Sequence, residues 1–457
     1  MAVFDRLPVL SLRQMAMTKV AITVCLDPEI LDFVKDYGCA SFVFPSKETH
    51  LYLNAKCPVE ENWMWKDIMV EKIKSKFSYL HRTRRNATET DDCEPKNNVL
   101  PFANWEELVE ERISSFLLPQ LLQHELLDVV RSVSIEIDKW IKDHTKDWRL
   151  SPVLARCVQY DFQWNLHGKI DRGRTARKLI FNEKLDIEDR YLFAILYSLV
   201  DKMANREQVP HEIVEKYLNI YENGWSTLIG NVEFEYISRH KCFINMSSDI
   251  KCVFLTSLLM EECAQYEDFI FYISHMRDEE KKRVFKSCFF YILLPLLDWP
   301  LQCEFLKAAE HLLPYFTESY FLLMLDLIIY ERIMMRRKDF NYIDLLKGFW
   351  SLSPSSLKES IKTHSIYEPL MFIVNFPVGE MFPNQQLLEM YTCSDLRFTS
   401  CGAKYGLMRQ KMPIDVIKCY SQSTFGTFPA ITFIHLFIFD KDSKTKHDQS
   451  RVPVRRE

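Results

Sequence analysis

The sequence predicts a mainly α-helical protein, built as an irregular array of antiparallel helices, with a solenoid as one form the array can take. Apolar residues recur at three- and four-residue spacing through most of the 457 residues. Glycine is scarce, with 10 residues, where average usage of roughly 7% would give about three times as many. Because tight hairpins, phosphate-binding loops and β-bulges consume glycine, its scarcity favours helices over sheets.

The first eighty residues predict a small mixed or helical unit. Two runs rich in β-branched or aromatic residues, KVAITVCL (19–26) and ASFVFPSKETHLYLN (40–54), flank the helix-like stretch DPEILDFVKDY (27–37). An α+β unit and a set of helices with irregular connections both fit this pattern. Residues 81–103 combine few apolar residues with many turn formers, which is typical of a linker or a long loop.

Residues 104–376 predict the helical array itself. In LDIEDRYLFAILYSLVDKM (185–203), apolar residues recur at i, i+3, i+4, i+7, i+8 and i+11 from Leu192, which predicts one amphipathic helix. The segment 317–338 repeats this design. Thr317 can cap its first turn, and the basic residues 336–338 can meet the negative end of the helix dipole.

The pattern changes after residue 376, so 377–439 is predicted as a separate C-terminal segment. It is either a small unit of its own or an end that is not native to the helical fold. Its most apolar part, FPAITFIHLFIF (428–439), has only twelve residues, whereas a membrane-spanning helix needs about 20. Its β-branched and aromatic content favours a buried strand instead. Residues 440–457 are charged and poor in apolar side chains, which predicts a disordered tail.

Composition limits the compartment and the partners. The formal net charge of −5 gives no overall attraction to nucleic acid, and the basic clusters at 81–85 and 334–338 lack interleaved aromatic residues, so no nucleic-acid partner is expected. Asp5, Arg6 and Arg13 interrupt what would be the apolar part of an export signal. The 13 cysteines contain no Cys-x-x-Cys pair. These features predict a cytoplasmic protein, with the nucleus as an alternative.

The closest approach to a chemical motif is HGKIDRGRTARKLI (167–180). Gly168, four residues, and then Gly173, Arg174 and Thr175 fit the phosphate-binding loop except that arginine replaces lysine. The planar guanidinium of arginine does not reproduce the compact ammonium of lysine. No buried strand of a parallel sheet precedes the segment, as that loop requires. We interpret it as a solvated turn that leads into a helix.

Other candidate motifs are incomplete. Gly224 and Ser226 begin a nucleophile elbow, but Leu228 stands where the second glycine is needed. His240, Cys242 and Cys252 could supply three metal ligands, without a fourth at a recognised spacing. Adjacent acidic pairs such as 110–111, 261–262 and 279–280 point about 100° apart on a helix and cannot share one site directly. No catalytic, cofactor-binding or metal-ligating residue is therefore predicted.

Residues 156–201 contain the Tyr160-Asp161-Phe162 run, the turn Gly168-Lys169-Ile170-Asp171, and Asp189-Arg190-Tyr191 in the helices that follow. In these features the segment resembles a large group of uncharacterised helical proteins that is expanded in spiders and other arachnids. The resemblance covers about a tenth of the chain. It implies a helical fold and carries no activity with it.

Two hypotheses for function follow. The first is a non-enzymatic helical scaffold that binds a protein or peptide partner, because helical arrays commonly bind through extended surfaces. The second is an enzyme whose acid, base or nucleophile is dispersed over the sequence and assembled only by folding, since such a site leaves no local motif.

Overall fold

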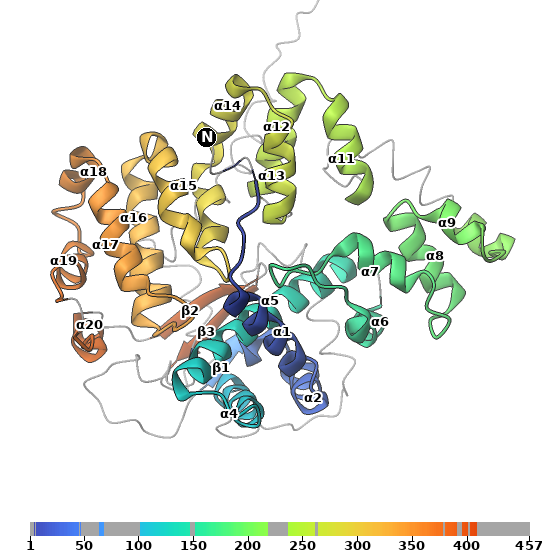
Figure 1. Cartoon of the computed structure of the whole chain (residues 1–457), viewed down its shortest axis with the longest axis horizontal. Coiled ribbons are helices and arrows are strands. Elements are labelled where there is room, and N and C mark those ends of the chain that lie inside the picture. The colour runs from blue at the N-terminus through green and yellow to red at the C-terminus, as the bar shows by residue number, and fades with distance from the viewer. Residues whose placement is uncertain are drawn as a thin grey trace, which may run out of the picture. The chain divides into compact units, whose positions relative to one another are not determined.

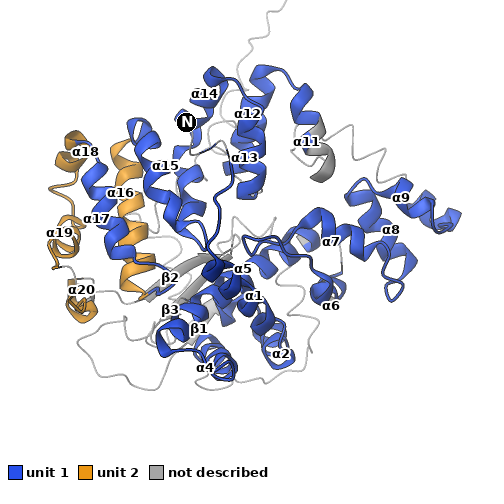
Figure 2. Cartoon of the chain, in the orientation of Figure 1, with its two compact units in different colours: residues 1–47, 101–316, 337–354 blue, residues 48–100, 317–336, 355–457 orange. Residues whose placement is uncertain are grey.

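The structure is a computed structural model of the whole chain. It describes residues 4, 6–44, 46, 64–67, 101–146, 151–217, 236–260, 264–377, 380–390, 395–400 and 403–408. Helices dominate the described residues, which confirms the predicted all-α class (Figure 1). Contacts divide the chain into two compact units (Figure 2). Unit 1 comprises Met1–Lys47, Pro101–Phe316 and Arg337–Pro354, and unit 2 comprises Glu48–Leu100, Thr317–Arg336 and Ser355–Glu457.

Unit 1 begins with helices whose ends follow from local sequence. Ser11 caps the first helix through its Oγ, which accepts the Gln14 N–H, while Gln14 Oε1 accepts the Ser11 N–H. Asp27 caps the second helix, where a proline occupies the first position. The elements of this part are α1 (Leu12–Cys25), α2 (Pro28–Tyr37), η2 (Gly38–Ser41), α4 (Pro101–Ser114), α5 (Gln120–Lys146), α6 (Pro152–Cys157) and η5 (Val158–Asp161).

Helix α5 is the centre of this part of unit 1. Both α1 and α4 pack against it. Its inner face is a stripe of buried apolar side chains at helical spacing: Leu126, Val129, Val130, Val133, Ile137 and Trp140. Of the stretch 19–26, for which strand and helix were both open, residues 19–25 lie within α1 and Leu26 is its C-cap.

The remaining elements of unit 1 are also helical. They are α7 (Arg172–Leu179), α8 (Ile187–Leu196), α9 (Val200–Ala204), α11 (Tyr236–Asn245), α12 (Ser248–Met260), α13 (Tyr266–Ser274), α14 (Asp278–Leu293), η7 (Leu294–Leu297), η8 (Gln302–Glu304), α15 (Phe305–Leu312), η9 (Leu313–Tyr315) and α17 (Tyr342–Leu352). Among them α12 packs against α14, and α15 packs against α17.

The single helix predicted over 185–203 is two helices, so that expectation was wrong. Helix α8 ends because Ser198 adopts a positive φ of 51°. The Leu199 N–H then donates to the Ala194 carbonyl oxygen at 2.7 Å, and the Ser198 N–H donates to the Ile195 carbonyl oxygen at 3.1 Å. These two bonds form the Schellman motif that closes a helix, usually with glycine in the position of Ser198. The apolar spacing continues across the break, so periodicity alone gave no sign of it.

Unit 2 contains shorter helices and a small sheet. Its elements are β1 (Met64–Asp67), α16 (Glu318–Asp326), the π-helix η10 (Leu327–Met334), α18 (Ser355–Ser360), α19 (Tyr367–Val374), α20 (Asn384–Met390), β2 (Asp395–Ser400) and β3 (Ala403–Met408). The strands form an antiparallel sheet in the order β1-β3-β2. Strands β2 and β3 pair from Asp395 opposite Met408 to Ser400 opposite Ala403.

The predicted segment 317–338 is helical as far as Met334, but its second half winds as a π-helix. Thr317 occupies the capping position, although its hydroxyl makes no capping bond and instead lies 3.1 Å from Ser319 Oγ. Residues 81–100, 428–439 and 440–457 lie outside the described residues, so the predictions made for them remain predictions. Of the predicted linker, residues 101–103 begin α4. No helix in the described ranges is both long and apolar enough to cross a membrane.

Candidate functional site

A polar turn at residues 163–170 gathers more titratable side chains than its sequence suggests. Asn165 shapes the turn, because its Oδ1 accepts the backbone N–H groups of His167 and Lys169, each at 3.0 Å. Gly168 adopts a φ of 67°, and a Cβ at this position would lie 2.8 Å from Thr18 Cγ2. Glycine therefore lets the turn approach α1 closely while His167 and Lys169 face neighbouring helices.

Glu267 connects this turn to α13. The Gln265–Asp268 capping box fixes the start of α13 and leaves Glu267 in the first turn. Glu267 Oε1 accepts the Asn165 Nδ2–H at 2.7 Å and lies 3.1 Å from His167 Nδ1. A carboxylate in the first turn also lies at the positive end of the helix dipole, which is a favourable position for a negative charge.

Glu136 of α5 connects the same turn to the centre of unit 1. Its Oε1 accepts the Ile170 N–H and the Gln265 Nε2–H, each at 3.1 Å. Its Oε2 lies 3.6 Å from Lys169 Nζ. Burial lowers the pKa of Lys169, but the charges of Glu136, Asp298 and Glu267 together outweigh burial, so the pKa lies above its ordinary value. Lys169 and Glu136 thus form an ion pair between the turn and α5, and Gln265 at the start of α13 bonds to the same carboxylate.

The partners of His167 define its charge. Nδ1 faces the Glu267 carboxylate, and Nε2 lies 3.3 Å from the carbonyl oxygen of Pro8. Both partners are acceptors only, so both ring nitrogens must carry a proton for both bonds to form. The hydrogen bond with Glu267 raises the pKa of His167 above its ordinary value, which favours this imidazolium form.

His144 of α5 shows the opposite case. Its Nδ1 lies 2.8 Å from the Trp140 carbonyl oxygen, and its Nε2 lies 2.7 Å from the Tyr197 hydroxyl. One partner accepts and the other can donate, which suits a neutral ring with its proton on Nδ1. Burial lowers the pKa of His144 to about 3, so this histidine stays uncharged.

In this geometry the His167–Glu267 pair acts as an ion pair and not as an acid–base catalyst. A general base needs a neutral imidazole with a free lone pair directed at the substrate. Both nitrogens of His167 are engaged with protein acceptors. The arrangement can hold segments together, and its strength depends on the proton that His167 carries.

The resemblance to a phosphate-binding loop does not extend to the structure. Residues 168–171 form the end of the turn, and α7 begins at Arg172. The Asp171 carboxylate accepts the Arg174 N–H at 2.8 Å and so occupies the helix N-terminus that would bind a phosphate. Thr175 is fully buried, and its Oγ1 accepts the Gln163 N–H at 2.9 Å. The hydroxyl that would hold magnesium therefore has a structural role.

The other sequence candidates are not brought together. His240 Nε2 lies 3.0 Å from Asp268 Oδ1, while the Cys252 thiol faces the Glu280 carbonyl oxygen at 3.8 Å. The described ranges contain no group of three or more histidine, cysteine or acidic side chains suited to a metal ion. Gly224, Ser226 and Leu228 lie outside those ranges.

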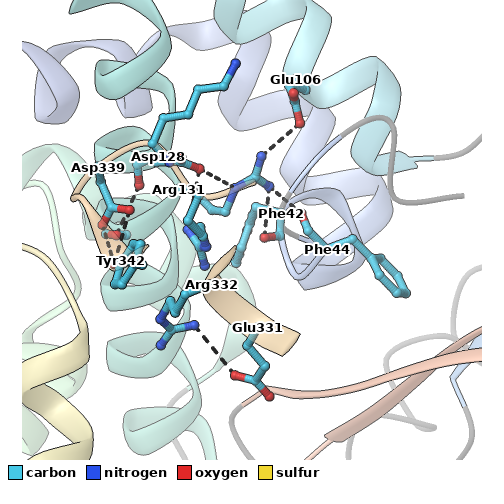
Figure 3. Close-up of polar contacts among 12 residues, drawn as sticks. Phe42, Phe44, Glu106, Asp128, Arg131, Glu331, Arg332, Asp339 and Tyr342 are labelled. Carbon is cyan, nitrogen blue, oxygen red and sulfur yellow. Dashed lines mark hydrogen bonds and ion pairs between the residues drawn. The ribbon is translucent and has the colours of Figure 1, made fainter. Parts of the chain in front are cut away.

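A second polar network lies within unit 1 and is buried. The Arg131 guanidinium donates to Glu106 Oε2 at 2.9 Å and to the carbonyl oxygens of Phe42 and Phe44 at 3.2 and 2.6 Å (Figure 3). Asp128 Oδ2 accepts the Lys338 N–H at 2.7 Å.

Lys338 is followed by Asp339, which belongs to a second buried group of polar side chains. Gln302 Nε2 donates to Asp339 Oδ2 at 2.8 Å, and the Tyr342 hydroxyl lies 3.1 Å from the Leu297 carbonyl oxygen. Their polar groups are directed at one another, which is typical of a structural network.

Among the described residues of unit 2, one carboxyl group has a strongly raised pKa. Asp326 ends α16 directly before the π-helix η10 and is buried. Burial, and next the charge of Glu331, raise the pKa of Asp326 to about 7. π-helical turns frequently mark functional positions.

Sequence reasoning missed His167 and Arg131 because their partners lie far along the chain. His167 and Pro8 are 159 residues apart, and Arg131 and Phe42 are 89 apart. The one local signal was Gly168-Lys169, which marked a turn without indicating its partners. No family model matches the chain, and neither does any curated protein or solved structure.

Proposed function

We propose that this protein is a non-enzymatic helical scaffold that binds a protein or peptide partner through a face of unit 1. We call this the Leu166 face and define it by Val9, Leu12 and Leu166. The exposed fractions of these residues are 96%, 81% and 69%. Single exposed aliphatic residues are ordinary, whereas several near one another on a fixed support suit an interface.

The support for this face is the polar turn. Pro8 and His167 are in contact, so Val9 and Leu166 are each one residue from the same hydrogen bond. Leu12 begins α1, whose Arg13 forms an ion pair with Glu125 of α5. Because these segments are already held, presenting the aliphatic side chains to a partner requires little loss of conformational entropy. This arrangement is the observation on which the proposal rests.

The proposed compartment is the cytoplasm, with the nucleus as the alternative. The cysteines among the described residues are free thiols: Cys25, Cys39, Cys157, Cys242, Cys252, Cys288 and Cys303. Free thiols of this number suit a reducing compartment.

Site-specific photocrosslinking tests the proposed face. A photoreactive amino acid at Leu166 should capture a discrete partner in cells, whereas the same group at Val253, which is 65% exposed on α12, should not. With the identified partner purified, Leu166→Asp should weaken binding at least about tenfold, because a buried charge opposes desolvation. Val253→Asp should leave the affinity unchanged. Equal crosslinking at both positions, or equal loss of affinity in both variants, would contradict the proposal.

A dispersed-site enzyme is the second candidate, and Asp326 is the observation that favours it. A buried carboxyl group with a pKa near neutrality is suited to proton transfer. A screen for turnover of a metabolite mixture by the wild-type protein and by the Asp326→Asn variant distinguishes the enzyme from the scaffold. Turnover that disappears in the variant, with unchanged folding, would favour the enzyme over the scaffold.

A further inference from the structure

The N-terminal strap, residues 6–10, is held at both ends and in the middle, and Leu10 at its end is buried. Before it, the Phe4 ring packs against Phe269 of α13 and Phe285 of α14, with ring centroids 5.7 and 5.2 Å apart. After it, the Ser11 capping box begins α1. In Figure 1 this segment runs from the N-terminal label past α13 to α1. Between the two ends, the hydrogen bond from His167 Nε2 to the Pro8 carbonyl oxygen holds the middle of the strap.

That middle contact depends on a proton. If His167 loses one proton, a single N–H remains for two acceptors. The bond to the Glu267 carboxylate is charge-assisted and stronger than a bond to a neutral carbonyl group, so it retains the proton. Nε2 then presents a lone pair to the Pro8 oxygen, and the contact becomes repulsive.

We propose that His167 is a pH-operated latch, closed on the N-terminal strap when the imidazole is doubly protonated and opened when Nε2 loses its proton to solvent. The charged groups that face the ring are Glu267 from α13 and Lys169 from its own turn, and Glu136 of α5 pairs with Lys169. The strap contributes a neutral carbonyl group. Opening frees residues 6–9, while Phe4, the buried Leu10 and the Ser11 cap remain as anchors.

The direction of the switch follows from linkage. Glu267 raises the pKa of His167 above its ordinary value of about 6.5. The latch is therefore fully closed below that ordinary value, and it opens as pH rises through the higher pKa of the folded protein. Any effect of opening on partner binding rests on the proposed function, because Val9 belongs to both the strap and the Leu166 face.

The test measures the strap and the histidine separately, without a partner. A nitroxide attached to a ketone-bearing amino acid at Val9 reports strap mobility between pH 5 and 9. The ¹⁵N shifts of His167, assigned with His167→Gln, report its protonation. We expect nitroxide mobility to rise with the same midpoint as the His167 titration. The same probe at Val253 should show no transition.

A pair of matched variants makes the test decisive. Glu267→Gln should move both midpoints to lower pH, because the amide cannot stabilise the imidazolium charge. Glu125→Gln removes an ion pair between α1 and α5 and should leave both midpoints in place. Constant mobility at Val9 while His167 titrates, or a midpoint that ignores Glu267→Gln, would overturn the latch. If mobility rises while affinity for an identified partner stays constant, the latch stands and the assignment of Val9 to the binding face fails.

Discussion

The Arg131 guanidinium and the Glu106 carboxylate join α5 to α4, with Arg131 Nη2 2.9 Å from Glu106 Oε2. The Arg131 side chain has no exposed surface, and the same guanidinium donates to two carbonyl oxygens of residues 42–44. The guanidinium carbon of Arg131, Cζ, lies over the Trp105 ring, 5.0 Å from the ring centroid. One buried side chain therefore connects three segments of unit 1.

Replacing this arginine should destabilise unit 1 strongly. Arg131→Met removes the guanidinium from the buried Glu106 carboxylate, and breaking a buried ion pair in this way typically costs about 3–5 kcal/mol in free energy of unfolding. Urea unfolding measures the change. The exposed pair Arg283–Asp249 gives the control, and Arg283→Met should change the free energy of unfolding little, because exposed ion pairs are screened by water. Equal effects of the two substitutions would contradict the conclusion that Arg131 stabilises unit 1 by connecting three of its segments.

Gly168→Ala should destabilise through a clash that a second substitution relieves. The new Cβ would lie 2.8 Å from Thr18 Cγ2 at a positive φ, and strain with overpacking of this kind costs about 1–3 kcal/mol. Thr18→Ser removes the methyl group but keeps the Oγ that accepts the Trp299 Nε1–H, so the double variant should recover part of the loss in thermal unfolding. Gly173→Ala is the control, because its Cβ would meet no atom closer than 3.7 Å. Absence of any rescue by Thr18→Ser would show that the clash is not the cause.

Asp326 should make stability fall as pH rises. Its pKa of about 7 in the folded protein lies above the ordinary value near 3.9. The unfolded chain therefore releases this proton first, and between about pH 4 and pH 7 the folded state loses on the order of 4 kcal/mol relative to the unfolded state. Asp326→Asn should remove this slope from urea unfolding measured at pH 5 and pH 8. A wild-type slope that survives in the variant would exclude Asp326 as its source.

Two cysteines should differ in reactivity. Burial raises the pKa of Cys25 to about 12, and its thiol donates to the Val130 carbonyl oxygen at 3.3 Å. Cys157 is exposed at the end of α6. Because the thiolate is the reactive form, iodoacetamide at pH 8 should label Cys157 in the folded protein and Cys25 only after urea is added. Mass spectrometry of the peptides measures this order, and rapid native labelling of Cys25 would be inconsistent with the structure.

Much of the fold could be predicted because helices are local. The stripe on α5 and the caps Ser11 and Asp27 were not named from the sequence, but they lie within a few residues of the backbone they organise and are therefore local features of the same kind. The break at Ser198 was not visible, because a serine closes the helix where glycine usually does and the apolar spacing runs on. The candidate site was invisible for a different reason, since Pro8, Glu136 and Glu267 reach the 163–170 turn from three distant parts of the chain.

By itself the sequence determined the helical class, since apolar residues at a 3.6-residue period can leave water together only on a helix face. It could not determine the charge of a single histidine. His144 and His167 are the same residue type, yet a donor and an acceptor around one favour the neutral ring, and two acceptors around the other require the imidazolium ion. Only the tertiary structure decided this, because protonation depends on the burial and the partners that long-range packing supplies.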